Sequence, residues 1–327
     1  MAQLLLVILF AAMGAVSAAE NSLTAKQILQ KMVKAMAVSN YQGTVVFLKN
    51  DKLEAMKYSH SAEKNKEQER LVSLNSPLRE IIRNSDEVSC LFKLTRQVII
   101  DHRPYEHSFI VDVPKNLDEL DAGYHFEVVG EEDVAMLPSY VVAIQPKDDF
   151  RYARKIWIAK EHFLPMKVVV YGLSGVVLEQ VVFTEMQVDK GSVRKLNGSA
   201  EAAGFAQRAD GAEVASSDLS GQAAFEVTAL PQGFKQIFFS RKPLHQSDQP
   251  VDHLLLSDGL ASVSVYLETK KVETSPDSRI PEGIHSVGAI NSMSRTLADS
   301  QLTVLGEVPA PTVKFIAEGI KFRNSAP

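Results

Sequence analysis

Hydrophobic and polar positions follow two different periods along this 327-residue chain. Near the N-terminus they repeat at helical spacing, and Thr24 with Gln27 three residues later has the pattern of a capping box. The pattern predicts a helix that begins after Thr24 and ends near Ser39. One side of this helix is an apolar stripe of Ile28, Leu29, Met32, Val33 and Met36. Another element has to cover such a stripe, and strands follow almost at once.

The positions after this helix alternate with the two-residue period of β-strands. Short turn signals separate them, which favours an antiparallel meander over βαβ units. A short helix is predicted at 114–119. The predicted strands cover residues 42–48, 53–59, 70–74, 79–83, 88–92, 97–101, 124–129, 140–145, 155–159, 167–171 and 176–188. About eleven strands and one amphipathic helix predict a strongly curved sheet or incomplete barrel, with the helix packed in its concavity.

A second β-rich unit begins after Phe225. Its strands are predicted at 236–240, 253–257, 261–269, 287–294 and 301–307, and a short helix follows Pro311. Asp258-Gly259 is typical of a hairpin turn. After this turn, one strand face is apolar (Val263, Val265 and Leu267) and the other is formed by Ser262, Ser264 and Tyr266.

The stretch between these two units, residues 190–222, is rich in Ala, Gly and Ser and has no hydrophobic period, so it predicts an interdomain linker. The predicted fold class is α+β, mostly antiparallel β. The large domain is expected at 19–189, as an incomplete barrel with a packed helix. The smaller domain is expected at 223–327, as an antiparallel β unit with a short helix.

Residues 1–18 form the only long apolar run and predict a signal peptide, with small residues at the cleavage positions. The run is too short to span a membrane. The formal net charge of -5 gives no electrostatic reason to expect nucleic-acid binding. Cys90 is the only cysteine, so an exported form has no internal disulfide and depends on its cores for stability.

The sequence lacks the motifs of common catalytic and cofactor sites: a phosphate loop, a dinucleotide fingerprint, HExxH and paired CxxC. Ser174 lies in GLSG, which is typical of a turn and does not match GxSxG. His102 and His107 would need a further ligand to hold a metal. We therefore predict no enzymatic activity, no cofactor and no metal site.

The apolar interior of the large domain is the first candidate binding site. A curved sheet closed imperfectly by a Met-bearing helix can hold lipid, and ordinary core packing is the alternative. Burial contributes about 0.8 kcal/mol per CH₂, so one dodecanoyl chain is worth on the order of 8 kcal/mol. The candidate lipid-binding residues are Ile28, Met32, Met36, Phe47, Met56, Phe92, Trp157 and Met166.

A basic and aromatic run at 150–155 is the second candidate. Its cations could bind anionic lipid head groups or an acidic partner, and solvated surface cations are the alternative. The residues are Lys147, Arg151, Arg154 and Lys155.

Several longer segments carry a resemblance to a known family. They are YQGTVVF from Tyr41, ERLVSLN from Glu69, REIIR from Arg79, PKDDFRYA from Pro146, LEQVVFTEM from Leu178, LPQGF from Leu230, SDGLASVSVYLE from Ser257 and LTVLGEVPAPTV from Leu302. In this order and across both domains, the chain resembles the MucB/RseB family of periplasmic sigma-factor regulators. Its N-terminal half alone also resembles the LolA-type carriers that escort lipoproteins across the periplasm.

This resemblance implies a periplasmic negative regulator of the envelope-stress sigma factor. Such a protein binds the periplasmic domain of an RseA/MucA-type anti-sigma factor and shields it from site-1 proteolysis. The resemblance further implies that lipopolysaccharide or lipoprotein acyl chains bind the large domain and trigger release of that partner. A periplasmic lipid or lipoprotein carrier is the alternative, and assembly into a homo-oligomer stays open.

The smaller domain is where we expect the anti-sigma factor to bind, mainly between Gly233 and Leu267. The candidate contact residues are Phe234, Arg241, Lys242, His253, Ser262, Ser264 and Tyr266.

Overall fold

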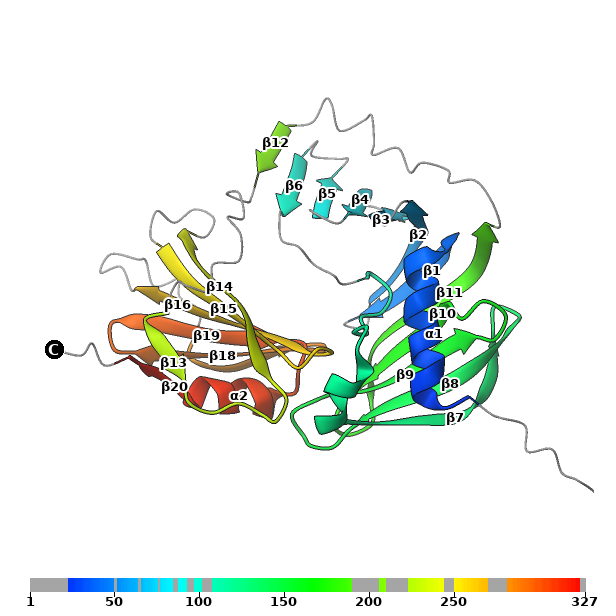
Figure 1. The fold of residues 1–327 in the computed structure, drawn as a ribbon. Coiled ribbons are helices and arrows are strands. Elements are labelled where there is room, and N and C mark those ends of the chain that lie inside the picture. The colour runs from blue at the N-terminus through cyan, green and yellow to red at the C-terminus, as the bar shows by residue number, and fades with distance from the viewer. Residues whose placement is uncertain are drawn as a thin grey trace, which may run out of the picture.

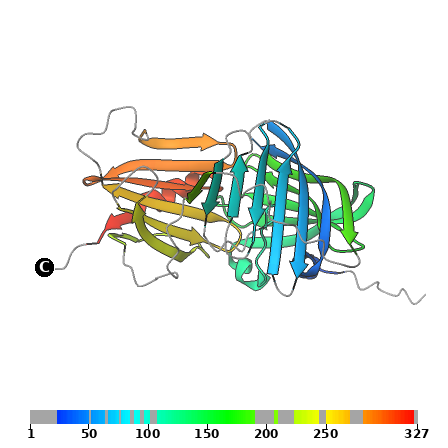
Figure 2. The same cartoon turned by 90° about the horizontal axis from the view of Figure 1, so that it is seen from above.

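The computed structural model describes residues 23–49, 52–63, 66–75, 77–84, 88–92, 97–101, 108–189, 206–209, 223–243, 250–269 and 281–323 (Figure 1). The predicted signal peptide and most of the predicted linker lie outside the described residues. The described chain forms one large and one small β-sheet, which lie side by side when seen from above (Figure 2).

The first element is the helix α1 (Ala25–Val38). Its capping box is confirmed: the Thr24 side chain accepts from the Gln27 backbone, and the Gln27 side chain accepts from the Thr24 backbone. The helix ends at Ser39, whose N–H donates to the Ala35 carbonyl. The apolar stripe faces the large sheet, with Ile28, Leu29 and Met32 fully buried.

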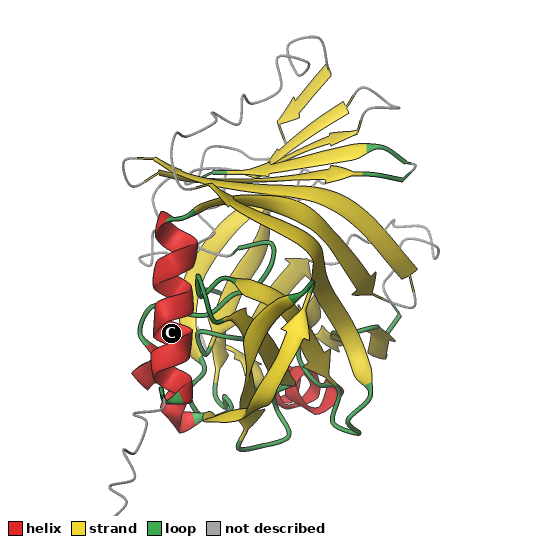
Figure 3. Cartoon of the chain, turned by 90° about the vertical axis from the view of Figure 1, so that its right-hand side faces the viewer, coloured by secondary structure: helices red, strands yellow, loops and turns green. Residues whose placement is uncertain are grey.

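The large sheet has twelve strands among the described residues, in the order β12-β6-β5-β4-β3-β2-β1-β11-β10-β9-β8-β7. In chain order they are β1 (Asn40–Lys49), β2 (Lys52–Glu63), β3 (Lys66–Ser73), β4 (Arg79–Arg83), β5 (Val88–Phe92), β6 (Gln97–Asp101), β7 (Tyr124–Val134), β8 (Leu137–Pro146), β9 (Ala153–Ala159), β10 (Pro165–Tyr171), β11 (Val177–Asp189) and β12 (Ala206–Ala209). Two meanders therefore meet where β1 pairs with β11. The sheet curves strongly, and α1 lies against it (Figure 3).

One strand of this sheet departs from the expected meander. β12 comes from the predicted linker and pairs with β6 in parallel, whereas the other pairings are antiparallel. The predicted short helix is a 3-10 helix, η1 (Leu117–Ala122), which directly precedes β7.

Two apolar clusters stabilise the large sheet. The first joins α1 and η1 to one side of β8 and β9, through Ile28, Leu117, Ile156 and Ile158 among others. The second draws on most strands from β1 to β11 and includes Val45, Met56, Tyr58 and Phe183. We call them the helix cluster and the strand cluster.

The small sheet contains six strands in the order β14-β15-β16-β19-β18-β17. They are β14 (Lys235–Pro243), β15 (Pro250–Ser257), β16 (Ser262–Thr269), β17 (Gly283–Val287), β18 (Ile290–Leu297) and β19 (Ser300–Gly306). The helix α2 (Ala310–Glu318) packs on this sheet, and β13 (Phe225–Val227) pairs with β20 (Ile320–Phe322). Val263, Val265 and Leu267 lie in the core, as predicted.

One predicted strand of this unit is wrong. The stretch 287–294 is not a single strand, because Gly288 adopts a positive φ of 61° in a turn between β17 and β18. The α+β class, with an open curved sheet and a packed helix, is confirmed. In the described part of the chain, no helix has the length and apolar character needed to cross a membrane.

Candidate functional site at the junction of the two sheets

The hairpin turn between β15 and β16 is inserted into the large-sheet unit. Gly259 takes the positive φ of 96° that this tight turn requires. Leu260 is only 4% exposed and belongs to the helix cluster, together with Leu117 and Leu120 of η1. A side chain from the small-sheet unit thus completes a core of the large one.

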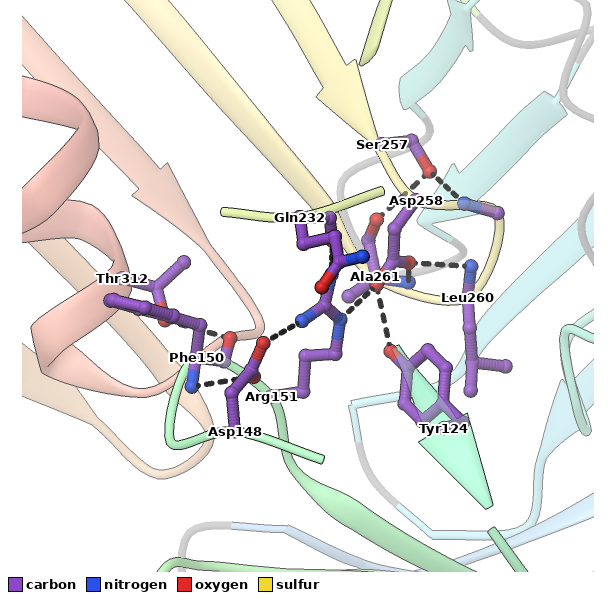
Figure 4. Close-up of polar contacts among 11 residues, drawn as sticks. Tyr124, Asp148, Phe150, Arg151, Gln232, Ser257, Asp258, Leu260, Ala261 and Thr312 are labelled. Atoms are coloured by element: carbon purple, nitrogen blue, oxygen red, sulfur yellow. Dashed lines mark hydrogen bonds and ion pairs between the residues drawn. The ribbon is translucent and has the colours of Figure 1, made fainter. Parts of the chain in front are cut away.

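Arg151 lies beside this turn and is fully buried. Its Nε donates to Asp258 Oδ2 over 2.5 Å, and its two terminal nitrogens donate to Asp148 and to the carbonyl of Gln232 (Figure 4). Asp258 is 3% exposed at its side chain. Since Arg151 and Asp148 belong to the large-sheet unit and Asp258 and Gln232 to the small one, this buried ion pair joins the two units.

Asp258 receives three further hydrogen bonds. Tyr124 Oη donates to Oδ2 over 2.9 Å, and the N–H groups of Leu260 and Ala261 donate to Oδ1 over 2.9 and 2.8 Å. Burial, followed by the charge of Asp258, raises the pKa of Tyr124 well above its usual range, so its hydroxyl stays protonated and donates. Both oxygens of this buried carboxylate therefore have hydrogen-bond donors.

Two aromatic rings lie within cation–π distance of the Arg151 guanidinium. Its central carbon lies 5.4 Å from the Tyr124 ring centre and 5.1 Å from that of Phe234. The backbone also comes close, because a Cβ at Gly123 would lie 2.9 Å from the guanidinium. A larger residue at Gly123 would therefore displace Arg151.

Contacts on either side extend the junction. Thr312 of α2 donates to the Phe150 carbonyl over 2.8 Å, and the rings of Phe150 and Phe315 lie 5.0 Å apart. Asn291 donates to Tyr152 Oη over 2.9 Å. Two solvated ion pairs also cross the junction, Lys49 with Glu307 and Lys235 with Glu119, both at 2.8 Å.

A second buried carboxylate, Glu69, lies inside the large sheet. It is 1% exposed and accepts from Arg83 Nε over 3.1 Å and from Tyr58 Oη over 2.9 Å. It also accepts from Ser108 Oγ over 2.5 Å and from the Phe109 N–H over 2.9 Å. Burial raises the pKa of Tyr58, so this hydroxyl is also a donor.

Comparison with known proteins identifies the family. The model of the MucB/RseB N-terminal domain matches residues 24–209, and the model of the MucB/RseB C-terminal domain matches residues 220–321. This chain belongs to the MucB/RseB family.

Relatives match nearly the whole chain. The sigma-E factor regulatory protein RseB of Escherichia coli K12 is 29% identical over 308 residues, which are 90% of each chain. The regulatory protein MucB of sigma factor AlgU from Pseudomonas aeruginosa is 26% identical and covers 97% of this chain and 96% of its own. A solved MucA/MucB complex from P. aeruginosa has a TM-score of 0.71 at 23% identity, covering 92% of this chain and 99% of the solved chain, and shows the shared fold.

Segments that carry the family resemblance meet at the two buried carboxylates. Arg151 belongs to PKDDFRYA, Asp258 to SDGLASVSVYLE and Gln232 to LPQGF. Tyr41, Glu69 and Arg83 come from YQGTVVF, ERLVSLN and REIIR, and Tyr41 Oη lies 3.2 Å from Tyr58 Oη. The sequence alone identified these segments but did not show that they converge.

The eight candidate lipid residues do not surround one cavity. Ile28 and Met32 lie in the helix cluster, whereas Met56, Trp157 and Met166 lie in the strand cluster. Met36 packs against both, Phe47 packs against the strand cluster, and Phe92 is half-buried at the end of β5.

Trp157 lies on a different face of the large sheet from Ile28 and Met32. Because side chains alternate along β9, Trp157 points away from the face on which Ile156 and Ile158 pack against α1. Its Nε1 donates to Glu132 over 2.7 Å, and Lys167 lies 4.3 Å from its ring centre.

The four candidate cations occupy different surroundings. The prediction that Arg151 faces a ligand at the surface is wrong, because the junction buries it completely. Lys147 is exposed and donates to the Asp121 carbonyl over 2.6 Å. Arg154 and Lys155 are half-buried on β9, with Lys155 Nζ 5.6 Å from the Tyr171 ring centre.

The candidate anti-sigma residues also differ in accessibility. Phe234 is 7% exposed beneath Arg151, so it is not part of an open surface. Arg241 is exposed and pairs with Asp252, and for Lys242 only the backbone is described. His253 is buried, stacks on Tyr266 at 4.4 Å and lies 3.1 Å from Ser264 Oγ. Tyr266, Ser262 and Ser264 are half-buried and reach the surface.

Proposed function

We propose that this protein is a periplasmic negative regulator of an envelope-stress sigma factor. It binds the periplasmic domain of an RseA/MucA-type anti-sigma factor and shields that domain from site-1 proteolysis. Family membership over both parts of the chain carries this proposal. It is supported by relatives that are named regulatory proteins of sigma-E or AlgU, and by a solved relative in complex with MucA.

The buried junction supports a partner site that depends on both units. Arg151 and Leu260 hold the two sheets together, so a partner meets one continuous surface. We place the main contact on the small sheet at the half-buried face of β16, where Tyr266 stacks on His253. Tyr is among the residue types that contribute most to binding energy at interfaces.

We further propose that acyl chains of lipopolysaccharide or lipoproteins bind the large-sheet unit and lower affinity for the anti-sigma factor. Such negative coupling requires that the lipid-bound and partner-bound states differ in structure. The predicted linker at 190–222 connects the two units, and its described segment, β12, pairs with β6 of the large sheet. A dedicated lipid carrier is not favoured, because the named relatives are regulators.

The test is protection of the anti-sigma periplasmic domain from its site-1 protease by the full-length protein. We expect the wild type to slow cleavage and Tyr266→Ala to bind the domain at least about tenfold more weakly. The matched control is Tyr171→Ala, which removes a half-buried tyrosine of the large sheet and should leave protection unchanged. Cleavage at the same rate with and without wild-type protein would refute the proposed function.

A further inference from the structure

The chain between β6 and β7 connects opposite ends of the large sheet. β7 is one edge strand, and β6 lies next to the other edge. The described end of this connection, Ser108–Val113, belongs to no strand and leads into η1, beside α1 (Figure 1). We call residues 108–113 the strap.

Side chains fasten the strap at its first residues. Ser108 Oγ and the Phe109 N–H both donate to the Glu69 carboxylate, and the Ile110 N–H donates to Ser108 Oγ over 3.2 Å. Glu69 is in turn fixed by Arg83 and Tyr58 on the neighbouring strands. One buried carboxylate thus connects the strap to the sheet.

Beyond this attachment, the strap fills the apolar interior. Ile110 is 4% exposed and packs in the strand cluster with Val45 and Met56, whereas Val111 is 7% exposed and packs in the helix cluster with Ile28. The strap therefore contributes adjacent side chains to both clusters. Seven of the eight candidate lipid residues belong to these clusters or pack against them.

Two pockets in the described part of the chain lie outside this apolar interior. One, of about 230 Å³, is lined by residues of the outer side of α1 such as Gln30 and Lys34. The other, of about 20 Å³, is polar and has room for about one water molecule. An apolar ligand that binds where Ile110 and Val111 are buried has to displace the strap.

We propose that the strap is a displaceable plug: it occupies the site of one unbranched acyl chain, and Glu69 is the latch that holds it in place. The strap lies outside the strands and places Ile110 and Val111 in the apolar interior, so an acyl chain that displaced it would take over their contacts. The inference rests on the lipid-dependent release proposed above and names the element that moves.

The strap also connects this site to the junction. It continues through Asn116, which caps η1, to Leu117 and Leu120, which pack against Leu260 of the small-sheet unit. Glu119 of η1 pairs with Lys235. Displacing the strap would pull on η1 and loosen its contacts with Leu260, so the acyl site and the junction are coupled through one continuous segment.

The test uses full-length protein and a fluorophore-labelled dodecanoate. Ser108→Ala removes one bond to the latch and should bind the probe about tenfold more tightly than the wild type, which corresponds to about 1.4 kcal/mol. Ser139→Ala is the matched control, because Ser139 is fully buried but bonds within β8. This control should bind the probe with wild-type affinity.

Hydrogen exchange supplies a second readout. Probe binding should speed exchange at the amides of Phe109 and Ile110, which donate to Glu69 and Ser108, and then at Leu260 and Ala261, which donate to Asp258. The inference is overturned if Ser108→Ala and wild type bind the probe equally, or if the Phe109 amide keeps its protection when the probe is bound. Neither result depends on the anti-sigma factor, whose binding without lipid tests the proposed function separately.

Discussion

The two buried carboxylates are surrounded by the same chemistry but join different parts of the molecule. Asp258 accepts from the Nε of an arginine, the hydroxyl of a tyrosine and two backbone N–H groups. Glu69 likewise accepts from an arginine Nε, a tyrosine hydroxyl and a backbone N–H, with a serine hydroxyl as its fourth donor. Because the two sites have the same donors, their different behaviour follows from their location: Asp258 lies between the two units and Glu69 lies within one sheet.

Glu69 and its arginine cannot separate while the large sheet is intact. Glu69 and Arg83 are direct register partners on β3 and β4, and Tyr58 lies on β2 next to β3. Arg151 and Asp258 come from turns of two separate units instead. If the units move apart, water reaches both charges, so the junction can open without unfolding either sheet.

The largest expected effect comes from removing the carboxylate inside the sheet. Glu69→Ala leaves the buried Arg83 guanidinium without this carboxylate, and Tyr58 and Phe109 lose their acceptor. Breaking a buried ion pair from one side costs about 3–5 kcal/mol. We expect the free energy of unfolding to fall by this amount, measured by denaturant titration of the fluorescence of Trp157, the single tryptophan.

Glu67→Ala is the matched control for this experiment. Glu67 lies on the same strand and 3.9 Å from the same arginine, but its side chain is 40% exposed. Its removal should cost less than about 1 kcal/mol. Equal losses for Glu67 and Glu69 would show that burial of the Glu69 pair does not contribute.

Arg151→Met should have the next largest effect, and a different signature. Opening of the junction hydrates Asp258, so the loss is limited to about 1.5–3 kcal/mol, the value of hydrogen bonds to charged groups. We expect the unfolding transitions of the two units to separate. Trp157 fluorescence reports the large sheet and circular dichroism reports both, so the two curves should no longer coincide.

Two further variants separate the ion pair from general effects of charge. Arg154→Met removes a neighbouring cation outside the junction and should keep the curves coincident. Asp258→Asn keeps an acceptor for the Leu260 and Ala261 N–H groups while removing the charge. The double variant Arg151→Met/Asp258→Asn completes a double-mutant cycle. If its loss in the free energy of unfolding equals the sum of the two single losses, the two side chains are not coupled, and the junction is held by its other contacts.

The sequence predicted the local elements of this comparison better than their long-range contacts. The capping box, the curved sheet and the hairpin turn at Asp258-Gly259 all follow from local spacing, and they are confirmed. The partners of Arg151 in the small-sheet unit lie 81 and 107 positions away, beyond the range of any periodic pattern. The sequence therefore offers Arg151 as a candidate for an anionic head group or an acidic partner, whereas the packing of the two units pairs it with Asp258.

The sequence did contain a signal for the second carboxylate that we did not use. Along β3 and β4, Glu69 and Arg83 occupy the same faces as Leu71 and Ile81, which are inward positions. Charges at such positions have to be paired when buried. This alternation predicts that Glu69 and Arg83 meet. It does not predict the bonds from the strap to Glu69, because the strap belongs to neither strand.

The smallest expected effect is a pH dependence at the edge of the Glu69 network. His60 pairs with Glu69 in register, stacks on Tyr41 at 4.9 Å and donates from Nδ1 to the Ser39 carbonyl over 2.8 Å. Burial lowers the pKa of His60, although Glu69 and Glu67 favour its charged form and Arg83 opposes it. The folded protein therefore holds His60 neutral at a pH where the unfolded chain already binds the proton.

This lowered pKa fixes the sign of the effect. Above pH 6.5, His60 is neutral in both the folded and the unfolded protein, so this residue adds no pH dependence. Below pH 6.5, the unfolded protein binds more protons than the folded protein, so the free energy of unfolding falls. We expect the wild type to lose more stability than His60→Gln between pH 7 and 5, as measured by denaturant unfolding. A difference between the two proteins that stays constant from pH 8 to 5 would mean that burial does not shift this histidine. In that case water would reach the Glu69 network, as it would reach the junction if the two units moved apart.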